Sequence, residues 1–315
     1  SAGDKKPKVT TTTEPPVVPA PLTGRPIDRE VARRPVVSVK VDNSPQGRPQ
    51  AGLAAADVVF EEKVEGGVTR FIAIFQSQDT DLVGPIRSLR TTDPPVVSAL
   101  GGVFVFSGGA AIAQRRLDGA PVKAVSEDKS KDPFTYPKGK RRPFATFAAT
   151  ARLRQEAPSD ARTPPALFAF LAEGEAFAAA GAAPAVKAQV NYSPRTSAGF
   201  DFDAASGTWL RSTNGTPHVL ADQSRLAFTN VIIQYVNYTG VGYNDSSGNP
   251  VDEAAVVGSG EAVVLVGGQQ VRGRWSKPGP TDVTAFTDAS GAPLKLAPGT
   301  TLVALAPTGA PTTIS

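Results

Sequence analysis

The 315-residue sequence contains no cysteine and no methionine, and His218 is its single histidine. The absence of cysteine excludes disulfides, thiolate metal sites and cysteine nucleophiles. Because not even an initiator methionine is present, we expect the chain to begin after a processing event or an engineered boundary. No run of about 18 or more apolar residues occurs, so no membrane-spanning helix is expected.

Strong net charge is also missing. There are 33 basic and 29 acidic side chains, a balance of +4 that gives no indication of a nucleic-acid partner. The charge is uneven, however, because residues 108–154 hold eleven Lys or Arg against four acidic residues, most densely at Lys138–Arg142. This stretch is either a solvated basic loop or a surface for an anionic ligand.

Length and local sequence pattern predict an α+β protein with a tether and two domains, since 315 residues suffice for two domains of ordinary size. Residues 1–22, rich in Thr, Pro and Lys, are expected to be a flexible tether. Residues 23–182 predict a mixed α/β domain built around a β-hairpin, with a helical Ala-rich stretch at Pro164–Ala180. Residues 183–315, with short strands between Gly-containing turns, predict a mostly antiparallel β domain.

The central hairpin is predicted from two β-rich runs that meet at Gly66-Gly67, since two consecutive glycines favour a two-residue turn. Such a turn would pair Lys63 with Arg70 and Glu61 with Ile72. Alternation along the strands would then place Glu61, Glu65 and Arg70 on one face, as a Glu–Arg–Glu group beside Lys63. The group is either part of a site or a solvated salt-bridge face.

A ligand site is predicted from three arginines that are close in sequence, Arg70, Arg87 and Arg90. Guanidinium groups suit two-point contacts to phosphate or carboxylate. Asp42 and Arg48 lie in the turn region before the hairpin and are further candidates. Gly108-Gly109, between a strand and a helix, is a possible anion cradle or a simple turn. The alternative for all of these residues is a structural ion-pair network.

Catalysis has weaker candidates, Glu61 and Glu65. They lie four residues apart on one strand, about 13 Å at 3.3 Å per residue. The carboxyl groups of a typical glycosidase are about 5–9.5 Å apart, so these two are not a pair with each other. A serine triad would need His218 from the other domain. No loop has the spacing of a calcium site, and no metal or cofactor is expected.

The motifs DNSPQGRPQAGL, ADVVFEEKVEGGVTRF and GPIRSLR resemble those of the YerB-like bacterial lipoprotein family, and the likeness extends over about residues 22–308. In the second half it includes Gly215–His218 and Gly258–Lys277. This resemblance implies a secreted lipoprotein with a lipid-bearing cysteine just before the chain, on the outer face of the cytoplasmic membrane. It implies no established reaction.

The sequence departs from the family at three places. Many relatives have His and Ser around the glycine pair, where this chain has Phe106 and Ala110, and Pro-His-Asn where it has Pro143-Phe144-Ala145. Because those histidines would be natural acid–base or metal groups, His-dependent chemistry is not expected here.

Three functions remain open. The first is an extracytoplasmic lipoprotein that binds an anionic cell-wall or lipid-derived ligand through the Arg/Glu cluster. The second is a phosphodiesterase- or glycosidase-type hydrolase of envelope polymers, with Glu61 or Glu65 as acid or base. The third is a scaffold that docks a protein partner through its β domain. The sequence indicates no oligomeric state.

Overall fold

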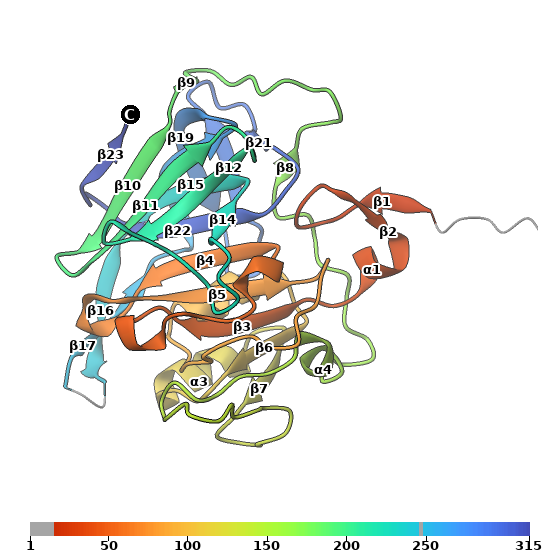
Figure 1. The fold of residues 1–315 in the computed structure, drawn as a ribbon, viewed down its shortest axis with the longest axis vertical. Helices are drawn as coiled ribbons and strands as arrows, with labels where there is room; N and C mark the ends of the chain where they lie inside the picture. The colour runs from red at the N-terminus through yellow and green to blue at the C-terminus, as the bar shows by residue number, and fades with distance from the viewer. Residues whose placement is uncertain (1–15, 246–247) are drawn as a thin grey trace, which may run out of the picture.

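The computed structural model describes residues 16–245 and 248–315 (Figure 1). The chain is mostly sheet, and its helices are short. They are α1 Arg29–Arg33, α2 Asp93–Val97, α3 Ala111–Asp118 and α4 Thr150–Arg154, with 3₁₀ turns η1 Pro45–Gly47, η2 Leu53–Ala55 and η3 Glu65–Gly67. Within the described ranges, every helix is too short or too polar to cross a membrane.

One eleven-stranded sheet, the main sheet, takes strands from both predicted domains (Figure 1). Its spatial order is β20-β19-β18-β15-β22-β4-β5-β3-β6-β7, and β9 pairs with β19 outside this path. β22 lies in the middle, parallel to β15 on one side and to β4 on the other. The bounds are β3 Val37–Asp42, β4 Val58–Lys63, β5 Thr69–Phe75, β6 Val103–Phe106, β7 Lys123–Ser126, β9 Ala183–Pro184, β15 Asn230–Val236, β18 Gly258–Val266, β19 Gln269–Lys277, β20 Ala285–Asp288 and β22 Thr301–Pro307.

A second, antiparallel sheet covers one face of the main sheet. Phe200 and Trp209 from this sheet share one buried cluster with Phe71 and Ile233 of the main sheet. All four side chains are at most 1% exposed, so the two sheets meet in a dry interface. The second sheet consists of β10 Lys187–Ser193, β11 Thr196–Asp203, β12 Thr208–Thr213, β13 Thr216–Pro217, β14 Ala227–Phe228 and β23 Thr312–Ile314.

The opposite face of the main sheet is covered by α2 and α3. Val97 of α2 and Leu117 of α3 lie in a second buried cluster with Ile74 and Val264 of the sheet. Because both faces of the central strands are covered, β5 reads as a continuous apolar run from Phe71 to Phe75.

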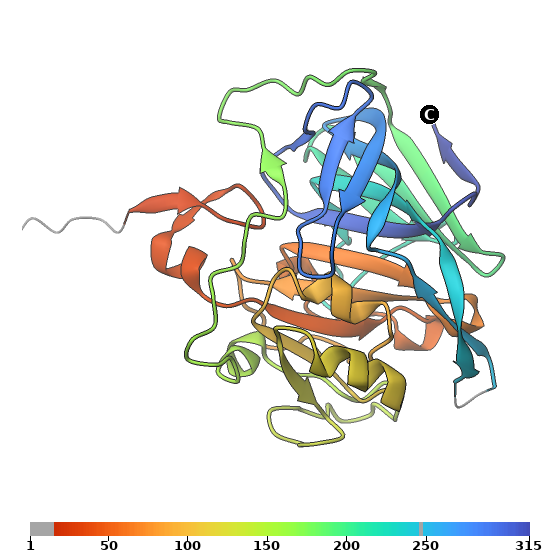
Figure 2. The same ribbon diagram turned by 180° about the vertical axis from the view of Figure 1, so that it is seen from behind.

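Three two-stranded pieces complete the fold: β1 Val17–Pro19 with β2 Pro26–Asp28, β8 Ala169–Phe170 with β21 Lys295–Leu296, and β16 Tyr238–Asn244 with β17 Pro250–Ala254. The β16–β17 arm extends from the C-terminal half and lies beside the N-terminal half in both views (Figures 1 and 2). Asp252 of this arm bonds Lys63 Nζ at 3.0 Å.

The central hairpin forms, but the predicted register is wrong by one residue. The turn is longer than two residues, since η3 occupies Glu65–Gly67 and the Val64 N–H donates to the Val68 carbonyl. Glu62, rather than Lys63, therefore lies opposite Arg70. A shift of one residue moves side chains to the other face of a sheet. Glu61 and Arg70 consequently lie on opposite faces, and the predicted Glu–Arg–Glu group does not form.

The helix predicted at Pro164–Ala180 is also wrong. The stretch is extended and turn-rich, with β8 paired to β21. Alanine raises helix propensity, but tertiary packing overrides it here. The Phe168 ring packs on Phe286, and Gly174 has φ +74°, which a helix does not allow.

The continuous sheet predicts that both halves unfold together. Leu302 of β22 is fully buried, and truncation to alanine should cost about 2–5 kcal/mol. We expect Leu302→Ala to lower the urea midpoint equally for tryptophan fluorescence, which reports Trp209 and Trp275 of the C-terminal half, and for amide exchange in β3 and β5. Val257→Ala, at a 39% exposed position, should leave the midpoint unchanged. Separate transitions for the two probes would contradict the prediction.

Candidate functional site

The carboxylate of Glu61 lies between the two sheets, held by Arg211 of β12. Arg211 Nη2 donates to Glu61 Oε1 at 2.6 Å, and its Nε donates to Oε2 at 3.3 Å. Both residues are 0% exposed. The guanidinium carbon also lies 5.2 Å from the centre of the Phe71 ring. This is a two-point ion pair in a dry environment, where removing one partner leaves an uncompensated charge.

His218 is neutral, and its tautomer follows from its neighbours. An arginine N–H can only donate, so His218 Nδ1 accepts from Arg211 Nη1 at 2.6 Å. The proton is therefore on Nε2, which donates to Gln50 Oε1 at 2.9 Å. Burial, together with the positive charges of Arg211, Arg48 and Arg225, lowers the pKa of His218 to about 2.

Gln50 and Asn43 close the connection back to Glu61. Gln50 Nε2 donates to Asn43 Oδ1 at 3.0 Å. Asn43 Nδ2 donates to Thr69 Oγ1 at 2.7 Å, and the Thr69 hydroxyl donates to Glu61 Oε1 at 2.8 Å. The ring of Glu61, Arg211, His218, Gln50, Asn43 and Thr69, here called the Glu61 network, has a consistent donor and acceptor at every bond. It fixes the second sheet to the hairpin.

Glu65, at the hairpin turn, holds two of the three predicted arginines. Its Oε1 accepts from Arg70 Nη2 at 3.2 Å and also from Arg90 Nη2, while its Oε2 accepts from Arg90 Nε at 2.8 Å. The Ser88 carbonyl accepts from Arg70 Nη1 at 2.9 Å. The structure thus joins Glu65, Arg70 and Arg90, the Glu65 cluster, and leaves their polar atoms largely occupied.

Burial dominates the electrostatics of the Glu65 cluster. It lowers the pKa of Arg70 and of Arg90, while nearby carboxylates, Glu62 and Asp93 among them, oppose that shift. The β16–β17 arm packs nearby, because Arg116 pairs with Glu253 and the Ala254 N–H donates to Thr92 Oγ1 at 3.0 Å. Arg70 and Arg90 are therefore poorly placed to meet a large ligand.

Lys40, Glu62 and Asp93 form a second buried ion group, the Lys40 triad, which the sequence did not predict. Lys40 Nζ donates to Glu62 and to Asp93 Oδ1, the latter at 2.6 Å, and all three side chains are at most 1% exposed. Two carboxylates share one ammonium. Burial, with a further contribution from the charge of Glu62, raises the pKa of Asp93 to about 7.

Arg87 is the predicted arginine that reaches the surface. Its side chain is 19% exposed, and its Nε donates to Asp42 Oδ2 at 2.6 Å. The Phe144 ring lies under the guanidinium, with its centre 5.5 Å away. Phe144 stands where the family resemblance implies a histidine, so this chain places an aromatic platform beside a cation instead of an acid–base group.

The loop beside Arg87, residues 128–144, is here called the basic loop. It carries six exposed cations, Lys129, Lys131, Lys138, Lys140, Arg141 and Arg142. Buried Glu127 anchors it by accepting from Lys131 Nζ and from Arg142 Nη2, at 3.3 and 2.5 Å. The loop and Arg87 lie beyond the carboxyl ends of the parallel strands β3, β6 and β7, the edge where open α/β sheets commonly bind ligands.

Gly108 and Gly109 lie at the same edge, and close packing accounts for both. A Cβ on Gly108 would be 2.0 Å from an Asp128 carboxylate oxygen, and one on Gly109 would be 2.6 Å from the Leu89 side chain. The Gly108 carbonyl accepts from the Leu89 N–H at 2.9 Å. The nearby carboxylate of Asp128 disfavours an anion in the predicted cradle.

Arg48 lies within electrostatic reach of both the Glu61 network and Asp42, the partner of Arg87. Burial first, and the charge of Arg211 second, lower its pKa. The sequence did not single out Lys40, Glu62, Asp93 or Arg211 as site residues. The available signal was a charged residue inside an otherwise apolar run, as at Lys40 in Val36–Val41.

Comparisons with known proteins cover most of the chain. A family model described as "Protein of unknown function (DUF3048) N-terminal domain" matches residues 22–163, and its C-terminal counterpart matches residues 188–303. "Putative lipoprotein YerB" of Bacillus subtilis (strain 168) is 43% identical over 99 residues, which are 31% of this chain and only 30% of that protein. The crystal structure of the YerB protein from Bacillus subtilis has a TM-score of 0.78 and 22% identity, and the match covers 94% of this chain and 99% of that one. At that identity it shows a common fold.

The Glu61 network predicts acid sensitivity. His218 has a folded-state pKa near 2 and an unfolded value near 6.5, so its stabilising contribution is present above pH 6.5 and is lost progressively as the pH falls. The slope for one proton is about 1.4 kcal/mol per pH unit. We expect the wild type to lose about 2 kcal/mol more unfolding free energy than His218→Gln between pH 7 and pH 5. Chemical denaturation at each pH measures this, and parallel profiles would refute it.

The Lys40 triad predicts the opposite slope. The pKa of Asp93 is raised to about 7 in the folded state, so its contribution is fully present below its unfolded pKa and is lost as the pH rises through 7. Relative to Asp93→Asn, the wild type should lose stability between pH 4 and pH 7, at up to about 1.4 kcal/mol per pH unit. The same denaturation series tests this, with Asp118→Asn, an exposed acid on α3, as control.

Proposed function

Because the chain belongs to the DUF3048 family of YerB-like proteins, as its motifs predicted, we propose that it is an extracytoplasmic lipoprotein that binds an anionic envelope-derived ligand at Arg87 and the basic loop. The location is supported by the likeness to a Bacillus subtilis protein named as a lipoprotein. Residues 1–15 of the expected tether, 1–22, lie outside the described residues, whereas Val17–Pro19 forms β1 and Leu22 is fully buried, so the described end of that segment belongs to the fold. A lipid anchor before it would hold the folded part at the outer face of the membrane.

One observation carries the binding proposal: six exposed cations in the basic loop adjoin a partly exposed arginine that is already oriented. Asp42 and the Phe144 ring hold the Arg87 guanidinium between them. A group fixed before binding loses less conformational entropy when the ligand arrives. The surrounding lysines and arginines would raise the local concentration of a polyanion and its association rate.

This proposal differs from the sequence-based one in the arginine that carries it. Arg70 and Arg90 are bonded to Glu65 and to backbone carbonyls, so they support the floor of the site. Arg87 and the basic loop supply the accessible charge. Arg48, Gly108 and Gly109 are expected to shape the edge rather than contact the ligand.

The hydrolase alternative has less support. Glu61 is fully buried and bonded to Arg211, and Glu65 is bonded to Arg70 and Arg90. A general acid or base must reach the substrate directly or through one water. Neither carboxylate offers an accessible oxygen beside the basic loop, so the arrangement favours binding. Docking of a protein partner through the β domain has no specific observation behind it.

The binding proposal predicts that charge in the basic loop controls affinity. Replacing Lys138, Lys140 and Arg141 by Gln should weaken binding at least tenfold, since each cation near an anionic surface contributes about 1 kcal/mol. Two probes separate the ligand sources, phosphatidylglycerol vesicles and soluble phosphate-containing wall fragments. Affinity for the true class should also fall steeply with salt.

A matched control removes the same charge elsewhere. Lys187, Arg195 and Lys295 are exposed cations of the C-terminal half, and their triple replacement by Gln should leave binding within twofold of the wild type. The variant Arg87→Gln tests how much the oriented arginine beside the basic loop contributes to binding. Equal weakening by both triple variants would indicate unspecific charge attraction, and no binding of either probe would sink the proposal.

A further inference from the structure

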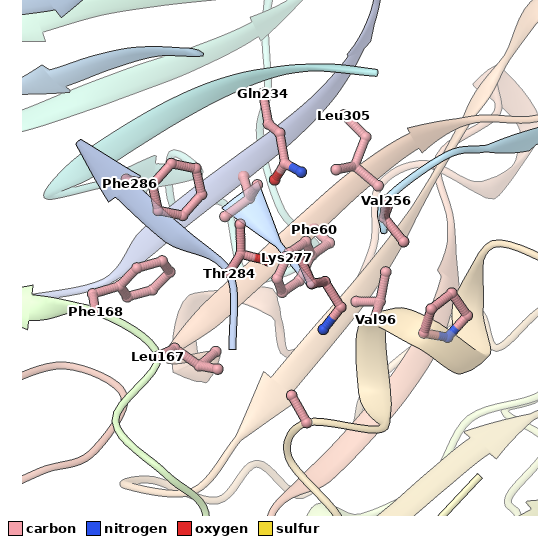
Figure 3. A pocket seen from close by; sticks show the side chains of 13 residues that line it. Phe60, Val96, Leu167, Phe168, Gln234, Val256, Lys277, Thr284, Phe286 and Leu305 are labelled. Carbon is pink, nitrogen blue, oxygen red and sulfur yellow. The ribbon is translucent and has the colours of Figure 1, made fainter. Parts of the chain in front are cut away.

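A small pocket lies on the α2 side of the main sheet (Figure 3). Its walls come from α2, the segment 167–168, and strands β4, β15, β19, β20 and β22. Most lining side chains are apolar, among them Phe60, Val96, Leu167 and Phe286. Strands of both halves therefore build it, and it exists only in the assembled fold.

Three polar groups point into this apolar pocket: the Lys277 ammonium, the Gln234 carboxamide and the Thr284 hydroxyl (Figure 3). Gln234 is 2% exposed, and within the described ranges its carboxamide forms no hydrogen bond with another part of the protein. Its amide therefore keeps its donors and its acceptor available to a ligand in the pocket.

The ammonium group of Lys277 also uses only part of its hydrogen-bonding capacity. It is 3% exposed, and its Nζ donates to the backbone carbonyl of Asp282. No carboxylate forms an ion pair with it in the described part of the chain. Burial lowers its pKa to about 8, opposed by the charge of exposed Asp282, and no other lining residue is ionisable. The ammonium keeps two further N–H donors, and the charge of exposed Asp282 opposes its burial only in part.

A larger apolar cleft adjoins the pocket. The pocket itself has a volume of about 30 Å³, enough for a group the size of one or two water molecules. The adjoining cleft has about 320 Å³ and shares Leu167, Phe168, Thr284 and Phe286 with it. Ile232, Leu294 and Leu296 extend its apolar lining. A volume of 320 Å³ lies within the range of small-molecule sites.

We propose that this pocket and cleft bind an amphiphilic carboxylate with a single unbranched apolar tail. The carboxylate would pair with the Lys277 ammonium and accept from the Gln234 amide and the Thr284 hydroxyl. The tail would lie along Phe168, Phe286 and Leu296. The ligand would supply a counter-charge, and the apolar walls explain why a single lysine suffices to fix its orientation. This site is separate from Arg87 and independent of the function proposed there.

Calorimetric titration of the full chain with decanoate, below its micelle concentration, tests the proposal. We expect one molecule to bind per chain at pH 7. Lys277→Met should weaken binding at least tenfold and Gln234→Leu at least fivefold, while Lys187→Met, an exposed lysine, should change nothing. Decanol should bind at least tenfold more weakly than decanoate, and decanoate should lose affinity between pH 7 and pH 9.5 as the lysine loses its proton.

A stability measurement separates ligand binding from a purely structural role. Because the Gln234 amide lacks a partner, Gln234→Leu should raise the thermal midpoint of the free protein while it weakens decanoate binding. A lower midpoint, with decanoate affinity unchanged, would assign Gln234 to the core and overturn the proposal. Equal binding of decanoate and decanol, or no decanoate binding at millimolar concentration, would overturn it as well.

Discussion

The ion pair between Glu61 and Arg211 is the contact on which the rest of the structure depends. It joins the central strand pair of the N-terminal half to the second sheet, and both charges are fully buried. Charges in such a setting are tolerated only when every remaining donor and acceptor is satisfied. His218, Gln50, Asn43 and Thr69 meet that condition, so the polar ring fixes the relative position of the two sheets more strictly than apolar contacts would.

Whether a charge is already paired also separates the residues that support the fold from those that are available to a ligand. The family motifs contribute residues both to a buried group around Glu61 and to an edge group around Arg87. Within the edge group, Glu65 neutralises Arg70 and Arg90, whereas Arg87 remains partly open over an aromatic ring. A motif residue can thus be essential to the fold without contacting any ligand.

Local patterns predicted the hairpin and the short strands of the C-terminal half from sequence, because turn residues and apolar alternation are local signals. The register was not predictable, since a longer turn at Glu65–Gly67 differs from a two-residue turn by one position and exchanges the faces of Glu61 and Glu62. The contacts of Arg211 and His218 could not be predicted from the sequence for another reason. Their partners are 150 and 168 residues away in the chain, and no spacing rule covers such contacts.

The central place of β22 in the main sheet has a consequence for how the protein is made. β22 begins at Thr301, and it supplies the neighbour that β4 needs on one side. A chain that emerges from its amino end therefore carries β4 as an open sheet edge until almost all of it has emerged. β4 would stay unpaired on that side throughout. The topology therefore delays closure of the main sheet until the last strands of the chain are available.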